Sequence, residues 1–265
     1  MSTMRVLVTG ACGQMGRHIV RAVAEAPDMD LVGAVDPAGV DRDIGEVALG
    51  HPLGLRVAGH LPAAIAEAQP DAMVDFTHPD VVMDNLTVAL KAGVACVVGT
   101  TGLGPNDLKV LERLCQRHRV TCIVAPNFSL GANLMMRFAA EAARYFDYAE
   151  IIERHHERKA DAPSGTALKT AEMMTASRSE PMRPVPTAHD KLPGSRGGEM
   201  AGIRIHAVRL PGYVANQEVC FGNTGETLVI QHLTTSRECF VPGVLLALRR
   251  LREFDGLVYG LEKLL

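Results

Sequence analysis

The sequence predicts two domains of different architecture: a doubly wound α/β domain with a parallel sheet, then an α+β domain with a mainly antiparallel sheet. Two observations carry this prediction. Up to about residue 126, short apolar runs alternate with helical patterns, as expected when helices cover both faces of a parallel sheet. From residue 127 onward, strands with period-two alternation and a hairpin turn replace that pattern. We therefore place a domain boundary after residue 126.

In the first domain each predicted strand is apolar along its whole length, which is typical of strands buried on both faces. Strands are expected over residues 5–9, 31–36, 72–77, 96–99 and 121–125, and helices over residues 15–26, 79–91 and 105–117. Open sheets of this kind bind ligands at the carboxyl ends of their strands. The loops that follow the strands are therefore the candidate binding segments.

The loop after the first strand is rich in glycine. It reads Gly10-Ala11-Cys12-Gly13-Gln14-Met15-Gly16 and lies between a predicted strand and a predicted helix. Such a turn lets backbone N–H groups approach a pyrophosphate at the helix N-terminus, although this glycine spacing is less specific than G-x-G-x-x-G. We predict a Rossmann-type dinucleotide-binding domain in which Gly10 to Met15 contact the cofactor. Arg17 adds charge beside the loop, or is a solvated residue of the first helical turn.

Asp36 closes the second predicted strand, where a carboxylate can bind the hydroxyls of an adenosine ribose. The alternative is a turn aspartate before Pro37. A carboxylate disfavours a 2′-phosphate, and no arginine stands directly beside it, although Arg42 is near in sequence. The prediction is NADH as the preferred cofactor, with NADPH possible.

Two more loops follow predicted strands at the same edge of the sheet. Gly99-Thr100-Thr101-Gly102 offers small residues, hydroxyls and backbone amides beside a cofactor. Ala125-Pro126-Asn127-Phe128-Ser129 offers an amide side chain that can hold a nicotinamide carboxamide. We predict that residues 99–101 and 125–128 contact the cofactor; the alternative for each loop is an ordinary turn.

The second domain mixes helices with alternating strands. Helices are expected over residues 130–145 and 166–177, strands over 149–153, 202–209, 214–221 and 226–232, and a final helix over 241–253. Asn223-Thr224-Gly225 is a hairpin signal between the last two strands. The Pro-, Ser- and Arg-rich residues 177–198 are expected to form a loop.

The segment from Glu153 to Ala167 contains the densest group of candidate catalytic and binding residues in the sequence. His155, His156 and Lys159 precede the turn Ser164-Gly165-Thr166, which opens a predicted helix. A helix N-terminus and a lysine favour an anion, and an imidazole can bind a carboxylate or pass a proton. The combination predicts a pocket for a small polyanionic substrate that is protonated during the reaction.

Two other interpretations of this segment stay open at this point. A run of charges is usually a solvated face, and Ser, Thr or Gly before a helix is usually a cap. A metal site built from His155, His156, Glu157 and Asp161 is the other alternative, but zinc-type ligand spacing is missing, so the prediction is no metal.

Length and charge limit the class of partner. The chain has 265 residues, enough for two modest domains, and a net charge of −3. This charge gives no reason to expect nucleic acid or a membrane surface as partner. The six cysteines are scattered without a C-x-x-C pair, which is typical of reduced thiols. We expect a cytoplasmic protein that binds small molecules.

Taken together, the chain resembles the 4-hydroxy-tetrahydrodipicolinate reductase (dihydrodipicolinate reductase) family from end to end. The most specific match is Lys159-Ala160-Asp161-Ala162-Pro163-Ser164-Gly165-Thr166-Ala167. Other matching segments are Gly13-Gln14-Met15-Gly16-Arg17, Asp75-Phe76-Thr77, Gly99-Thr100-Thr101-Gly102, residues 125–129, Glu150-Ile151-Ile152-Glu153, His155-His156, residues 204–209 and Tyr259-Gly260-Leu261-Glu262.

The resemblance implies a function and roles for individual residues. It implies NAD(P)H-dependent reduction of 4-hydroxy-tetrahydrodipicolinate, a small dicarboxylate, in the diaminopimelate route to L-lysine. His155 would donate or accept the proton and Lys159 would donate one, while His156, Gly165 and Thr166 would bind the substrate carboxylates. The resemblance also implies that residues 236–265 complete the cofactor domain, leaving 127–235 for substrate binding and assembly into a homotetramer.

Two rival functions remain at this stage. A protein that binds NADH without catalysis would keep the fold but show no turnover, and the intact His155 and Lys159 speak against it. A reductase of a different imine or keto acid would be distinguished by its substrate profile.

Overall fold

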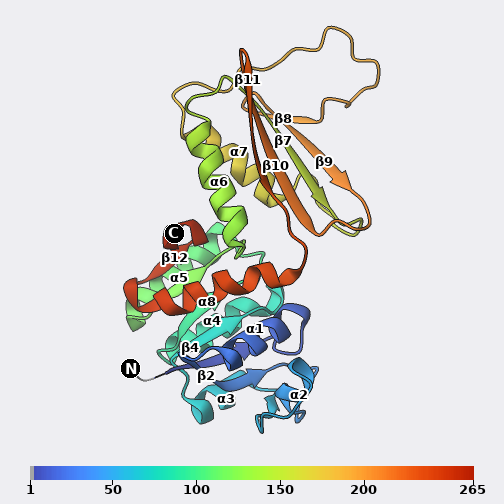
Figure 1. The fold of residues 1–265 in the computed structure, drawn as a ribbon. Coiled ribbons are helices and arrows are strands. Elements are labelled where there is room, and N and C mark those ends of the chain that lie inside the picture. Colours follow the sequence, from blue (N-terminus) through green and yellow to red (C-terminus); the bar gives the residue numbers. More distant parts are fainter. Residues whose placement is uncertain (1–2) are drawn as a thin grey trace. The chain divides into compact units, whose positions relative to one another are not determined.

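Residues 3–265 are described by a computed structural model, in which contacts within the chain define two compact units (Figure 1). Unit 1 comprises the described residues up to Phe128 together with Phe240–Leu265, and unit 2 comprises Ser129–Cys239. The sequence predicts boundaries after residues 126 and 235, whereas the two units meet after Phe128 and after Cys239. Across residues 3–265, each helix is too short or too polar to cross a membrane.

Unit 1 is built on a seven-stranded sheet with the order β12-β6-β5-β4-β1-β2-β3, in which neighbouring strands are parallel. The strands are β1 (Met4–Thr9), β2 (Met29–Val35), β3 (Val57–Ala58), β4 (Ala72–Asp75), β5 (Ala95–Val98), β6 (Cys122–Val124) and β12 (Leu257–Tyr259). From β3 to β6 this is the Rossmann strand order, and the direction of winding reverses between β1 and β4. The predicted fold class of this domain is confirmed.

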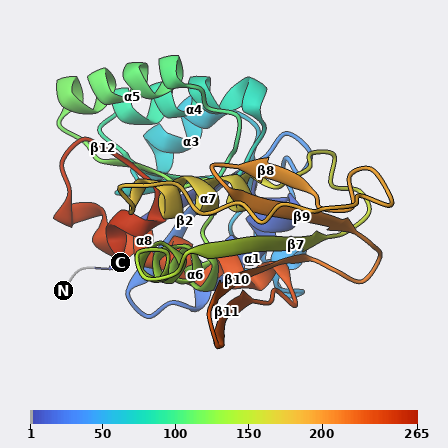
Figure 2. The same cartoon turned by 90° about the horizontal axis from the view of Figure 1, so that it is seen from above.

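Helices cover both faces of this sheet (Figure 2). On one face lie α1 (Gln14–Glu25) and α8 (Val241–Arg250); on the other, α3 (Leu61–Ala68), α4 (Pro79–Lys91) and α5 (Pro105–His118) form a row. The short α2 (Ile44–Ala48) contacts α1. Strand side chains such as Leu7, Met73 and Val98 are fully buried, which explains the continuous apolar runs in the sequence.

The sequence patterns do not predict α2, β3, α3 or β12. These elements have two to eight residues, too few for a clear periodic pattern. Pairing along the sheet determines the two strands, because β3 pairs with β2 and β12 pairs with β6. The final helix is shorter than expected and ends in a 3₁₀ turn, Leu251–Glu253.

Unit 2 contains a five-stranded sheet with the order β11-β10-β7-β9-β8. The strands are β7 (Tyr148–His155), β8 (Gly198–Met200), β9 (Ile203–Arg209), β10 (Ala215–Asn223) and β11 (Glu226–His232). Only the pair β7–β9 is parallel among these neighbours, and the chain between them crosses over through α7 (Gly165–Ala176). The predicted mainly antiparallel sheet is confirmed.

The helices α6 (Leu130–Ala142) and α7 pack against each other and against one face of this sheet (Figure 1). Alanines and Met174 of the helices meet Ile151, Val219 and Phe221 of the strands in a fully buried cluster. Strand alternation sends the intervening side chains to the opposite face, where Arg154 pairs with Glu218 and His206 with Glu150.

Strand β7 is longer than the sequence predicts, and the difference bears on the site. The expected strand ends at residue 153, whereas β7 ends at His155. Both neighbours hold the extra residues in the sheet, since His155 is paired with Ala215 of β10 and Arg209 of β9. At the other end of the expected loop 177–198, residues from Gly198 form β8.

Candidate active site

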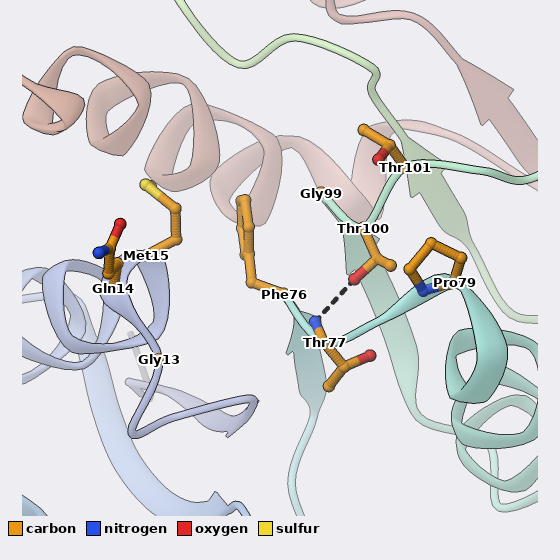
Figure 3. A pocket seen from close by; sticks show the side chains of 9 residues that line it. All are labelled: Gly13, Gln14, Met15, Phe76, Thr77, Pro79, Gly99, Thr100 and Thr101. Carbon is orange, nitrogen blue, oxygen red and sulfur yellow. Dashed lines mark hydrogen bonds between the residues drawn. The ribbon is translucent and has the colours of Figure 1, made fainter. Parts of the chain in front are cut away.

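A cavity of about 330 Å³ lies at the carboxyl edge of the parallel sheet in unit 1 (Figure 3). It is formed by the start of α1 and the loops after β4 and β5, with the lining residues Gly13, Gln14, Met15, Phe76, Thr77, Pro79, Gly99, Thr100 and Thr101. These loops flank the point where the winding of the sheet reverses, which is where such sheets bind nucleotides. The cavity brings together two of the predicted cofactor segments, 13–15 and 99–101.

The glycine loop allows the backbone to approach this cavity closely. Gly10 has a φ of 71°, and a Cβ atom there would lie 2.2 Å from the carbonyl oxygen of Phe76. A Cβ atom at Gly16 would lie 1.9 Å from the carbonyl oxygen of Gly10. Helix α1 begins at Gln14, its N-cap residue Gly13 makes no side-chain capping hydrogen bond, and its first turn has no acidic side chain. The positive end of α1 is therefore suited to a phosphate group, and the loop fits the pyrophosphate of a dinucleotide.

The buried carboxylate of Asp75 ties the loops around the cavity together. Its Oδ1 accepts hydrogen bonds from the Thr77 N–H (3.2 Å), the Thr77 hydroxyl (2.8 Å) and the Thr100 hydroxyl (2.6 Å). Its Oδ2 accepts from the Thr9 hydroxyl (2.8 Å) and from Asn85 Nδ2 (3.0 Å). The Thr100 hydroxyl in turn accepts from the Thr77 N–H at 2.7 Å (Figure 3). One carboxylate thus connects the ends of β1, β4 and β5 with the middle of α4.

Asp36 lies at the end of β2 and is 8% exposed. Its carboxylate accepts backbone hydrogen bonds from Cys12 and Ala38, both at 2.9 Å, so it fixes the glycine loop. Burial, followed by the charge of Asp36, raises the pKa of the Cys12 thiol, and the charges of Arg17 and Arg42 act to lower it. Two arginines therefore lie near the loop that would hold the adenosine end of a dinucleotide.

The segment 125–128 is placed differently from the other predicted cofactor loops. It follows β6 at the same edge, and the Ala125 N–H still bonds to the carbonyl oxygen of Val98. None of its residues is among those that line the cavity. Phe128 is buried, and its ring lies 5.9 Å from that of Phe76, a cavity residue. Phe128 therefore contacts a residue that lines the cavity but does not line the cavity itself.

In unit 2 the centre of the candidate site is Glu153, which is fully buried. His155 Nδ1 lies 2.5 Å from Glu153 Oε2, and Arg209 donates to both carboxylate oxygens at 2.8 Å. The Ser164 N–H donates to Oε1 at 3.1 Å, and Arg209 also donates to the Asp161 carbonyl at 2.6 Å. Burial acts to raise the pKa of Glu153, but the hydrogen bonds from His155 and Arg209 outweigh it and lower the pKa to about 2. Glu153 is thus a carboxylate at neutral pH.

The turn after β7 carries two of the predicted site residues, His156 and Lys159. Lys159 Nζ donates to Asp161 Oδ1 at 2.7 Å, which lowers the pKa of Asp161. The Lys159 N–H bonds to the carbonyl oxygen of His156, closing the turn. His156 Nδ1 is buried and has no hydrogen-bond partner among the described residues. A buried ring nitrogen of this kind is a binding group for a ligand oxygen.

The turn leads directly into α7, which begins at Gly165. The Ser164 hydroxyl accepts from the Ala167 N–H at 3.2 Å, so this residue caps the helix. A Cβ atom at Gly165 would meet nothing within 4 Å, so there is open space beside its backbone. Gly165 and Thr166 lie in the first turn, where the helix dipole favours an anion. Lys159, His156 and the N-terminus of α7 thus follow one another closely along the chain.

The structure also assigns partners to residues of the alternative metal site. His155 is bonded to Glu153, and Asp161 to Lys159. Within residues 3–265, His, Cys, Asp and Glu side chains form no group of three or more that could hold a metal ion.

Several residues that shape the two sites are not among the predicted site residues. Phe76, Thr77 and Pro79 line the cavity. The predicted strand 72–77 includes the first two, whereas β4 ends at Asp75, so that both belong to the loop after it. Glu153 has no clear signal, because the predicted strand ends at residue 153 and only the extension of β7 to His155 puts the two side chains on one face. Arg209 had no local signal, because only the pairing of β9 with β7 brings it to Glu153.

A Rossmann sheet with a glycine loop at its reversal point, joined to an α+β unit, is the architecture of a pyridine-nucleotide-dependent oxidoreductase. Two family models match the chain: "Dihydrodipicolinate reductase, N-terminus" over residues 4–128 and "Dihydrodipicolinate reductase, C-terminus" over residues 131–265. The chain belongs to the dihydrodipicolinate reductase family.

Individual relatives cover the whole chain. The 4-hydroxy-tetrahydrodipicolinate reductase of Moorella thermoacetica is 51% identical over 100% of this chain and 99% of its own length. That of Desulfitobacterium hafniense is 49% identical over 100% of both. Among solved structures, the dipicolinate-bound dihydrodipicolinate reductase from Paenisporosarcina sp. TG-14 is 38% identical and has a TM-score of 0.87, covering 99% of this chain and 100% of that one. The expected resemblance is confirmed.

Proposed function

We propose that this protein reduces 4-hydroxy-tetrahydrodipicolinate to tetrahydrodipicolinate with NAD(P)H, in the diaminopimelate route to L-lysine. Its relatives carry this activity in their names, and one related structure binds dipicolinate, a planar ring with two carboxylates. The observation in this chain that carries the proposal is the turn from His155 to Thr166. It places two imidazoles, an ammonium group and a helix N-terminus together in unit 2.

The overall reaction fixes how many protons are needed. The substrate loses its hydroxyl group as water and gains one hydride, so one proton is consumed per turnover. In the proposal, the pair of His155 and Lys159 supplies this one proton. A charged lysine has no acceptor, so Lys159 acts only as a donor or a cation. A well-placed general acid accelerates such a step by about 10²–10⁴-fold.

The two substrate carboxylates bind to the remaining groups of the turn. The ammonium group of Lys159 is a hydrogen-bond donor, and His156 Nδ1 donates when it carries a proton. The N–H groups of Gly165 and Thr166 lie at the positive end of α7. Holding both carboxylates fixes the ring for reaction. Positioning of this kind accounts for up to about 7–11 kcal/mol of barrier reduction in favourable systems.

The cofactor residues of unit 1 hold the dinucleotide, which supplies the hydride when bound. In the proposal, Gly10 to Met15 bind the pyrophosphate, and Gly99 to Thr101 border the nicotinamide half. Ala125 to Phe128 complete the site, with Asn127 on the carboxamide. Asp36 binds the adenosine ribose, and its negative charge favours NADH over NADPH. Arg17 and Arg42, near the same loop, leave NADPH usable.

One assay tests the proposed reaction. The substrate is prepared fresh by condensing pyruvate with aspartate semialdehyde, and loss of nicotinamide absorbance is followed with NADH and with NADPH in parallel. Substrate-dependent oxidation with a larger kcat/KM for NADH is the expected result. Binding of NADH without turnover would identify a binding protein instead. Turnover only with another imine or keto acid would overturn the substrate assignment.

We also propose a homotetramer assembled through the sheets of unit 2. The sheet face opposite α6 and α7 carries polar ion pairs, and β11, at the sheet edge, exposes Leu228 and Val229. An edge strand with exposed apolar side chains is a pairing surface. Sedimentation velocity should give four times the chain mass of 28.4 kDa, and Val229→Glu should shift the protein to smaller species.

Cysteine chemistry supports a cytoplasmic location. All six cysteines lie in the described part of the chain and none is in a disulfide. Free thiols are typical of a reducing compartment. Fractionation of cells that express the tagged protein tests this location.

A further inference from the structure

Glu153 is an unusual residue to find at its place in β7. It lies on the face of the sheet that carries Ala149 and Ile151 into the apolar core, and it is 0% exposed. A buried carboxylate loses its hydration, and an apolar residue of similar size would serve packing at least as well. The presence of a charge here therefore points to a role beyond packing.

The partners of Glu153 show what that role is. One carboxylate oxygen meets Nδ1 of His155 at 2.5 Å, and the guanidinium of Arg209 binds both oxygens at 2.8 Å. Glu153 and His155 are two residues apart on a strand paired on both sides, so the sheet itself sets their spacing. Because the Ser164 N–H donates to the same carboxylate, the start of α7 is fixed to it as well.

We propose that Glu153, clamped by Arg209, is the positioning residue for proton transfer: it binds the Nδ1–H of His155 and leaves Nε2 as the nitrogen that delivers the proton. This inference rests on the proposed function, in which His155 is the proton donor.

The protons balance at each stage. The charged ring holds Nδ1–H against Glu153 and carries a second proton on Nε2. Transfer breaks the Nε2–H bond, forms the new bond to the substrate, and leaves a neutral ring with Nδ1–H still on Glu153. Water then returns a proton to Nε2. Glu153 stays ionised throughout, since its pKa is about 2, and it acts as the buried aspartate does in a Ser-His-Asp triad.

The charged and titratable groups around this pair come from two elements, and a third element adds a neutral side chain. Strand β9 contributes Arg209, and the turn after β7 contributes His156, Lys159 and Asp161. Strand β10 places the neutral side chain of Gln217 opposite Glu153, and Gln217 donates to Thr170 of α7. Glu153 is therefore the carboxylate in direct contact with the His155 ring, and its removal leaves that ring near cations.

The first test uses the unaltered protein. In full-length protein labelled in the histidine rings, ¹⁵N chemical shifts identify which nitrogen of the neutral ring carries the proton, with His155→Asn used to assign the signal. The expected result is a neutral ring protonated at Nδ1. A ring protonated at Nε2, the form that free imidazole side chains prefer, would overturn the proposal.

The second test compares Glu153→Gln with Glu150→Gln. Glu150 is a matched control, because it also accepts from a histidine (His206, 2.8 Å) and an arginine (Arg196), but on the opposite face of the sheet. Loss of the carboxylate that accepts from the His155 Nδ1–H should move the basic limb of the kcat profile to lower pH in Glu153→Gln, with KM for NADH unchanged. Glu150→Gln should leave the kcat profile in place.

These results distinguish the proposed catalytic role of His155 from the proposed positioning role of Glu153. If His155→Ala keeps wild-type turnover, the proposed catalytic role of His155 is wrong. If His155→Ala loses turnover while Glu153→Gln leaves the kcat profile in place, only the positioning role is wrong. A merely structural glutamate would change the melting temperature without moving the kcat profile. If Glu153→Gln does not fold, the tautomer of the wild-type ring decides the question.

Discussion

Each unit of this protein contains a fully buried carboxylate, and the two are satisfied in different ways. Asp75 in unit 1 accepts five hydrogen bonds from neutral groups, namely hydroxyls, a backbone N–H and an amide. Glu153 in unit 2 is held by a guanidinium, an imidazole and one backbone N–H. Both are 0% exposed, so burial does not distinguish them.

The difference separates two tasks. Neutral donors around Asp75 fix the positions of loops without offering a proton that exchanges near neutral pH, which suits a cavity that has to keep one shape. Ionisable partners around Glu153 couple its charge to the protonation of His155, which suits a site that delivers a proton. Changes at Asp75 should therefore affect cofactor binding, and changes at Glu153 should affect proton transfer and its pH dependence.

The largest expected effect is on turnover. His155→Ala removes the proposed proton donor and should lower kcat by about 10²–10⁴-fold. Affinity for NADH, measured by fluorescence titration, should stay unchanged. His206→Ala is the control, because His206 is also paired with a glutamate on this sheet but lies on the other face. Equal losses in the two variants would contradict the distinction between the faces.

The next largest expected effect is on the free energy of unfolding. Arg209→Ala leaves Glu153 buried without its cation, and breaking a buried pair in this way costs about 3–5 kcal/mol. Urea unfolding measures the difference. Arg249→Ala breaks an exposed two-point pair with Asp28 and should cost about 0.2–1 kcal/mol. Similar costs for the two arginines would show that the burial of Glu153 has no energetic consequence.

The substitution Asp75→Asn tests whether Asp75 holds the loops around the cavity of unit 1. The amide keeps the shape but turns one acceptor into a donor facing groups that already donate, which should cost about 1.5–3 kcal/mol. KM for NADH should rise because the Thr77 and Thr100 loops lose their anchor. The basic limb of the kcat profile should not move. A shift of that limb would mean that the two carboxylates do not act separately.

A smaller effect is expected on the free energy of unfolding, which should lose the contribution of Glu153 as the pH falls. The pKa of Glu153 is lowered from an ordinary 4.5 to about 2, so its ionised form stabilises the fold above about pH 4.5. This contribution is lost as the pH falls from about 4.5 to about 2. The stability difference between wild type and Glu153→Gln, measured by urea unfolding, should therefore shrink over that range. A constant difference would contradict the lowered pKa.

The sequence predicts the strands and helices that are long enough to repeat a pattern. Strand β11 and helix α4 match their predicted limits, and the glycine loop and Thr100 lie at the same cavity, as expected from the edge of a parallel sheet. Arg209 was not predictable, because a parallel pairing across a crossover brings it to Glu153. The extension of β7 to His155 likewise depends on partner strands rather than on local residues.

A calorimetric titration with dipicolinate tests most directly whether unit 2 holds a ring with two carboxylates. Wild-type protein and Asp75→Asn should bind it with similar affinity, and Lys159→Ala should bind it at least tenfold more weakly, because the variant lacks a cation beside His156 and the start of α7. No binding to the wild-type protein, or equal binding to Lys159→Ala, would contradict the account.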